Sequence, residues 1–301
     1  MKSLERFGLL FAGVCVLNPS SAQDFSGVEI KTELVSDHVY VLFGAGGNIG
    51  VSAGEDGVFL IDDQYAPLTD KIRAAVETIN KGDIRFVLNT HWHGDHVGGN
   101  ENLAKGGSVV VAHDNVRKRM SVDTFFKTFN TEVKASPKDA LPVITYSKDL
   151  TLHLNGDTMW AYHVPEAHTD GDSIVFFENA NVVHMGDTFF NQMYPFIDVE
   201  SGGSIKGITA AANKVIYKSD PYTKIIPGHG PVTDLDGLRA YRDMLETIAA
   251  RLAKMIKDGA SLEEIQQSNI TDEWEEQWGN GFMKKDRFLM LAYLSLTGGE
   301  V

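Results

Sequence analysis

Four side chains that can bind a metal ion occur within six residues of the stretch NTHWHGDHVGGN (89–100), namely His91, His93, Asp95 and His96. Residues i and i+2 of an extended segment point the same way, so His91 and His93 can share one ion. Asp95 and His96 fall where the chain turns into the next predicted helix, and they face another direction. Six residues can begin two neighbouring metal sites but cannot complete two tetrahedral shells. The sequence therefore predicts further His or carboxylate ligands at turns beside strand ends.

Three distant positions meet that requirement. His168 in EAHTDGD precedes the apolar run SIVFF, Asp187 in HMGDTFF follows NVVHM, and His229 in IIPGHGP follows TKII. Each lies beside glycine at the end of a predicted strand, where the backbone can bend closely around a site. Asp170 and Asp172 are predicted to be supporting or turn residues. The remaining histidines are predicted to be structural, and they are His38, His113, His153, His163 and His184.

In this order, HWHGDH, AHTDGD, HMGDT and PGHG resemble the successive motifs of the metallo-β-lactamase superfamily, from residue 38 to about 232. The resemblance implies an α/β fold, the four-layer αβ/βα sandwich, and two zinc ions per chain. The implied ligands are His91, His93 and His168 for the first ion, Asp95, His96 and His229 for the second, and Asp187 as a bridge between them.

The chemistry of these ligands agrees with the resemblance. Imidazoles suit a borderline metal such as zinc, and carboxylates suit its charge. Two ions can lower the pKa of a water molecule from about 15.7 to near 7, so that a metal-bound hydroxide can attack a carbonyl. Two residues are therefore predicted to be catalytic, Asp187 by holding the ions and Asp95 by orienting the nucleophile.

Periodicity predicts two β-rich halves, each closed by helices, which suggests two sheets packed face to face with helices outside. Residues 113–147 are irregular, and both a lid and a surface excursion are compatible with them. Residues 272–278 (DEWEEQW) are interpreted as a solvated helix face. The predicted helices include one with Leu68, Ile72 and Val76 on its inner face, one over 205–217 and one over 238–255. The predicted strands are 38–43, 57–63, a strand ending at Leu88, 108–112, 150–154, 158–164, 173–177, 181–185 and 223–226.

The first 22 residues are typical of a secretory signal peptide, because Lys2 and Arg6 precede an apolar run that is followed by the small residues Ser20, Ser21 and Ala22. The run, 7–17, is shorter than the roughly 20 residues of a membrane-spanning helix. We therefore expect a periplasmic or secreted single domain over 23–301 with no stable membrane anchor. The net charge of −14 disfavours nucleic-acid partners and leaves a small-molecule substrate. The oligomeric state stays open.

The substrate is less determined than the metal site. Asp187 stands where the best-known β-lactamases have a zinc-binding cysteine, and the single cysteine of the chain lies within the predicted signal peptide. The preferred function is hydrolysis of a cyclic amide or ester, β-lactam or lactone. The alternatives are a thioesterase of the glyoxalase II type and a mononuclear iron persulfide dioxygenase, so the native metal is zinc, iron or manganese.

Residues 187–205 contain no Lys or Arg that could bind the carboxylate of a β-lactam. The sequence therefore predicts weak β-lactam binding, unless a cation reaches the site from Lys206 or from 113–147. An apolar substrate pocket is predicted instead, with core packing as the alternative for part of the set. Its predicted lining is Trp92, Phe189, Phe190 and Tyr194, with Met193 and Phe196 as further candidates from the same stretch.

Overall fold

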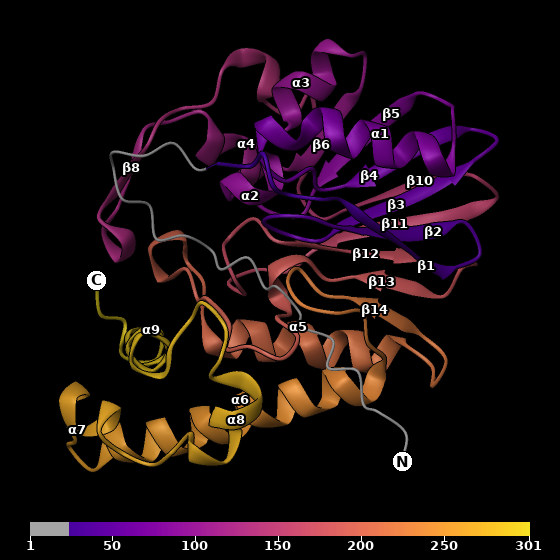
Figure 1. The fold of residues 1–301 in the computed structure, drawn as a ribbon. Helices are drawn as coiled ribbons and strands as arrows, with labels where there is room; N and C mark the ends of the chain where they lie inside the picture. The colour runs from indigo at the N-terminus through magenta and orange to yellow at the C-terminus, as the bar shows by residue number, and fades with distance from the viewer. Residues whose placement is uncertain (1–23) are drawn as a thin grey trace.

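The computed structural model describes residues 24–301, so the predicted signal peptide lies outside the described residues. Two large sheets pack against each other, and helices cover both outer faces (Figure 1). The seven-stranded sheet has the order β1-β2-β3-β4-β5-β6-β9, and the five-stranded sheet has the order β10-β11-β12-β13-β14. The predicted four-layer α/β sandwich is therefore confirmed.

The seven-stranded sheet comes from the first half of the chain and the five-stranded sheet from the second. The first sheet consists of β1 (Lys31–Ser36), β2 (Val39–Phe43), β3 (Ile49–Gly54), β4 (Gly57–Ile61), β5 (Ile84–Asn89), β6 (Val109–His113) and β9 (Ile144–Tyr146), and the second of β10 (Asp149–Leu154), β11 (Asp157–His163), β12 (Ser173–Phe177), β13 (Val182–His184) and β14 (Lys224–Ile226).

Strand β4 shows how the sequence alternates between two apolar layers. Phe59 and Ile61 point into the core between the sheets, where they meet residues of the second sheet such as Val175. Val58 and Leu60 point to the other face, beneath the first helix layer. Both faces of this strand are buried, which explains why GVFLI reads as a continuous apolar run.

Helices close the two outer faces. Helix α1 (Thr69–Ile79) places Ile72 and Val76 on the first sheet, and α5 (Ile205–Lys218) and α6 (Leu235–Lys257) cover the second (Figure 1). The side chain of Ser204 caps α5 and that of Asp234 caps α6. The remaining α-helices are α2 (Gly94–Val97), α3 (Asn100–Lys105), α4 (Asp114–Met120), α7 (Leu262–Gln266), α8 (Glu275–Trp278) and α9 (Lys285–Thr297).

Residues 113–147 contain a small hairpin and one strand of the first sheet. The hairpin pairs β7 (Thr124–Phe126) with β8 (Thr131–Val133), joined by the 3₁₀ turn η2 (Lys127–Phe129). Strand β9 pairs with β6 at the edge of the sheet. The segment is therefore more ordered than its composition indicates, and the hairpin reaches the candidate site described below.

The interpretation of 272–278 as a solvated helix face is wrong at its apolar positions. Trp278 is 2% exposed and packs against Tyr241 of α6, and Trp274 lies beneath the guanidinium of Arg251. Packing of the two large indole rings, of which that of Trp278 is buried, outweighs the acidic character of the segment. No helix within 24–301 combines the length and the apolar character needed to cross a membrane.

Candidate metal centre

The seven predicted ligands converge at one end of the two sheets. His91 and His93 follow β5, and Asp95 and His96 lie in α2. The other three come from loops of the second sheet. Two groups result, His91 with His93, His168 and Asp187, and Asp95 with His96 and His229, and within each group the candidate ligand atoms lie within 4.8 Å of one another.

Neighbouring oxygen atoms, one from a side chain and one from the backbone, orient two imidazoles of the first group. Nε2 of His93 lies 3.0 Å from Oδ2 of Asp198, and Nδ1 of His168 lies 2.8 Å from the carbonyl oxygen of Phe196. These contacts leave Nδ1 of His93 facing Nε2 of His168 at 2.9 Å. If Nε2 of His93 and Nδ1 of His168 carry the protons and donate to these oxygens, the lone pairs of the two facing nitrogens point at each other. A cation that both nitrogens can share removes this repulsion.

His91 supports the same assignment. Oγ1 of Thr90 donates to Asp62, so it accepts from Nδ1 of His91, 3.0 Å away. Nε2 of His91 is then an acceptor, and it is buried with no hydrogen-bond partner in the described structure. Burial lowers the pKa of His91 well below its usual value and lowers that of His168 to about 4. Both rings are therefore neutral, as a metal ligand must be, and the first group fits a metal ion.

The second group is built on carboxylates. Oδ2 of Asp62 lies 2.7 Å from Nδ1 of His96, which directs Nε2 of this ring toward His229, 3.4 Å away. Oδ2 of Asp95 lies 3.7 Å from Nε2 of His96 and 3.5 Å from that of His229. Burial opposes protonation of both rings, but Asp187 and Asp95 outweigh it and raise both pKa values. Such a buried acidic cluster favours a bound cation.

Asp187 lies between the two groups. Its Oδ1 is 3.1 Å from Nε2 of His96, and its Oδ2 is 3.3 Å from Nε2 of His229 and 3.6 Å from Nε2 of His168. This placement suits the predicted bridge. A Cβ atom at Gly228 would stand 2.1 Å from Oδ1 of Asp187, which explains the glycine before His229 in PGHG.

Two supporting carboxylates were missed in the sequence. Asp62 follows β4 directly, so its place at a strand end was a usable signal of the same kind as that of Asp187. Asp198 lies 105 residues from His93, in a loop without a recognisable motif. Asp172 has the supporting role that was predicted, because it accepts hydrogen bonds from the backbone amides of His168 and Thr169.

The predicted substrate pocket is wrong for two of its residues. Phe189 packs against Tyr241, and Tyr194 stacks on Phe288; both predicted pocket residues are fully buried in the core against the C-terminal helices. Trp92 and Phe190 do contact candidate ligands. The ring centre of Trp92 lies 5.1 Å from that of His93, and Phe190 stacks on His229 at 5.2 Å.

The remaining histidines lie outside both ligand groups. His184 contacts the carbonyl oxygen of Asn48, His38 lies 3.4 Å from Asp157, and His113 stacks on His163. Their contacts are structural, as predicted.

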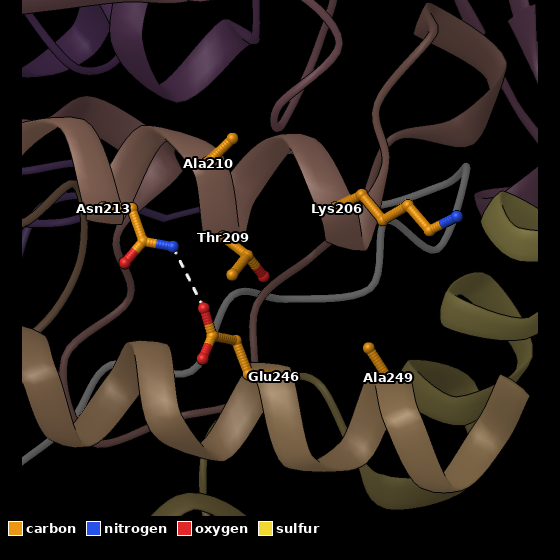
Figure 2. Close-up of a pocket in the computed structure, with 6 residues that line it drawn as sticks. All are labelled: Lys206, Thr209, Ala210, Asn213, Glu246 and Ala249. Carbon is orange, nitrogen blue, oxygen red and sulfur yellow. Dashed lines mark hydrogen bonds between the residues drawn. The ribbon is translucent and has the colours of Figure 1, made fainter.

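Lys206 does not supply the cation that the sequence left open. It lines a groove of about 270 Å³ between α5 and α6, together with Asn213 and Glu246, whose side chains are hydrogen-bonded (Figure 2). The groove contains none of the candidate metal ligands.

A family profile described as the Metallo-beta-lactamase superfamily matches residues 43–229, more than half of the chain. This chain belongs to the metallo-β-lactamase superfamily. The matched region includes all seven candidate ligands and ends at His229.

Named relatives agree with this membership. Beta-lactamase-like protein 2 homolog of Caenorhabditis elegans is 23% identical over 223 residues, which cover 71% of this chain and 65% of that protein. Hydroxyacylglutathione hydrolase of Erythrobacter litoralis is 34% identical over 95 residues, which cover 30% of this chain and 34% of that protein. The chain thus spans less than two thirds of each of these relatives.

A solved structure, a metallo-beta-lactamase from Pontibacter korlensis, superposes with a TM-score of 0.59 at 18% identity. The superposition covers 72% of this chain and 99% of that one, which shows the shared fold. Family, fold and ligand groups together support a metal-dependent hydrolase, as the sequence predicted.

Proposed function

We propose that this chain is a dinuclear zinc hydrolase that cleaves a cyclic amide or ester. One observation carries the proposal. Two groups of ligand atoms lie side by side with Asp187 between them, and neighbouring side chains turn the imidazole lone pairs inward. Two zinc ions held there would lower the pKa of a water molecule and polarise a substrate carbonyl.

The open side of the centre lies at the motif HWHGDH. Gly94 is exposed, and a Cβ atom placed there would meet nothing within 4 Å. His93 and Asp95 on either side of it are partly exposed, whereas His91 and His96 are buried. A substrate therefore approaches over Gly94, where the carboxylate of Asp95 can orient a nucleophile and hold its proton.

Metal analysis and a substrate panel test this proposal. We expect two zinc ions per chain in the protein as purified, and hydrolysis of lactones, aryl esters or β-lactams that stops on chelation and returns with zinc. A single iron per chain, with oxidation of a persulfide and no hydrolysis, would support the dioxygenase alternative and contradict this proposal.

The thioesterase alternative has one observation of its own in its favour. The 95-residue match to a hydroxyacylglutathione hydrolase shows a higher identity than the longer match to the C. elegans protein. A hydroxyacyl thioester of glutathione therefore belongs in the panel. If this thioester has by far the highest kcat/KM, the cyclic amide or ester assignment is wrong while the metal assignment stands.

We also propose that the chain is exported and cleaved after Ala22. Lys2 and Arg6 before an apolar run, followed by small residues, support export. Mass spectrometry of protein recovered from the periplasm or medium should find Gln23 at the N-terminus. An intact Met1 in the protein recovered there would contradict this proposal.

A further inference from the structure

Three phenylalanine rings border the first ligand group on the side of His93. The ring centre of Phe126 lies 5.8 Å from that of His93, and Phe196 stacks on His93 at 5.7 Å. Phe129 completes this aromatic wall, 5.7 Å from Phe126 and 5.1 Å from Phe196. Phe126 and Phe196 are buried, whereas Phe129 is partly exposed. Phe129 is therefore the ring of the wall that an incoming ligand can contact.

A cation stands at the outer end of the aromatic wall. The guanidinium carbon of Arg287, in the first turn of α9, lies 5.5 Å from the ring centre of Phe129. Within residues 24–301 this guanidinium makes no hydrogen bond and has no carboxylate oxygen within 4.0 Å. Arg119, by contrast, pairs with Asp170 through two nitrogens. All five donors of the Arg287 guanidinium are thus available to an anion.

One short segment, residues 198–201, contacts both the hairpin that carries the aromatic wall and the candidate ligand His93. The carboxylate of Glu200 accepts hydrogen bonds from the backbone amides of Lys127 and Thr128, at 2.9 and 2.8 Å, and from Oγ1 of Thr128 at 2.7 Å. Glu200 belongs to η5 (Val199–Ser201), and Asp198, which caps this turn, contacts His93. The hairpin that carries Phe126 and Phe129 is therefore fixed to the backbone that orients a ligand.

Building on the proposed hydrolysis of a carbonyl compound, we propose that the aromatic wall and Arg287 form a substrate subsite for a flat apolar group that ends in a carboxylate. The apolar group lies on Phe129, and the carboxylate pairs with the guanidinium of Arg287. The scissile carbonyl then lies on the side of the wall that faces His93. The stretch 187–205 lacks a cation, but α9, which lies beyond the matched region 43–229, supplies one.

Two matched esters test this subsite, 4-nitrophenyl benzoate and 4-nitrophenyl 4-carboxybenzoate. Because a charge-assisted contact is lost, Arg287→Gln should raise KM for the carboxylated ester by about ten- to a hundredfold. KM for the neutral ester should rise much less, because this ester has no carboxylate to pair with the guanidinium. Phe129→Leu should raise KM for both esters, since both place a ring on the wall.

Arg85→Gln is the matched control. Its guanidinium lies 5.6 Å from the ring centre of Phe86 near the start of β5, at the opposite end of the strand from the candidate ligands. This variant should leave all constants unchanged. An Arg287→Gln effect that is equal for the two esters, or absent for both, would overturn the subsite.

A binding measurement separates the subsite from the proposed reaction. The probe is 2-naphthalenesulfonate, a flat apolar anion whose sulfonate is a poor metal ligand, titrated calorimetrically into the protein as purified. Its Kd should rise about ten- to a hundredfold in Arg287→Gln and stay constant in Arg85→Gln. Equal binding to wild type and Arg287→Gln contradicts the subsite even if esters are cleaved. A panel without any cleaved substrate contradicts the proposed function, while the sulfonate Kd still decides the subsite.

Discussion

Nε2 of His93 lies 3.0 Å from Oδ2 of Asp198, and this contact turns Nδ1 of the same ring toward Nε2 of His168. Asp198 is 1% exposed, and its other oxygen accepts a hydrogen bond from the backbone amide of Ser201. A buried carboxylate that holds a ligating imidazole fixes its tautomer and raises its basicity. Asp198 is therefore a positioning residue for the first ligand group.

Asp198→Asn should weaken metal binding at this group by about 10- to 100-fold, because the amide turns a donor toward His93 in place of an acceptor. The side chain can still cap Ser201, so the turn should persist. Competition with a chromogenic chelator gives the affinity, and circular dichroism checks the fold.

Asp157→Asn is the control for this variant. Asp157 is a buried carboxylate that also contacts a histidine, 3.4 Å from His38, and neither residue belongs to a ligand group. The metal affinity of the Asp157→Asn variant should equal that of wild type. Equal affinities for Asp198→Asn and Asp157→Asn would show that Asp198 does not act on the metal.

Asp187→Ala should abolish or sharply reduce hydrolysis and lower the zinc content, while the chain remains folded. The carboxylate faces both ligand groups, and a bridge holds two ions at about 3.5–4 Å. Metal analysis, turnover and circular dichroism of the same sample provide the measurement. Wild-type activity with two metals retained would show that Asp187 does not bridge.

The carboxylate of Glu200 fixes the hairpin over 124–133 through hydrogen bonds to Lys127 and Thr128. Glu200→Ala removes three hydrogen bonds to Lys127 and Thr128. Local opening should increase by about ten- to a hundredfold, as expected for loss of charge-assisted bonds. Hydrogen exchange of these two amides measures it. Glu101→Gln is the control, because Glu101 only pairs with Lys105 at the surface.

The candidate ligands were predictable from the sequence because most of them stand near the end of an apolar run, and Asp95 and His96 belong to the motif that follows one. The contacts that complete the site were not. His93 and Asp198 are 105 residues apart, and Lys127 and Glu200 are 73 apart. No local pattern marks either partner, since the fold alone brings them together.

The missed strands have a similar cause. Strand β3 begins with the last two residues of the Gly-rich GAGGNIG, whose composition indicates a loop. These residues are nevertheless part of a central strand, because β3 pairs with β2 on one side and with β4 on the other. Strands β7 and β8 have three residues each and pair only with each other. Tertiary contacts, including those of Glu200, stabilise segments this short.

The stacked pair of His113 and His163 predicts how stability depends on pH. Their rings lie 3.7 Å apart at an angle of 9°. Burial lowers the pKa of both side chains, and the proximity of His163 lowers that of His113 further. At these two rings the folded protein therefore binds fewer protons than the unfolded chain once the pH falls below the ordinary histidine pKa of about 6.5.

The contribution of this pair to the free energy of unfolding should be constant above about pH 6.5 and should fall as the pH drops toward the lowered pKa values of the folded state. Urea unfolding of wild type and His163→Gln at a series of pH values measures it. The candidate metal ligands are the same in both proteins, so their contribution cancels in the difference. The wild type should lose more stability between pH 7.5 and 5.5 than the variant, because one of the two depressed groups is gone. If the two proteins lose equal stability, the pair does not titrate as its burial requires.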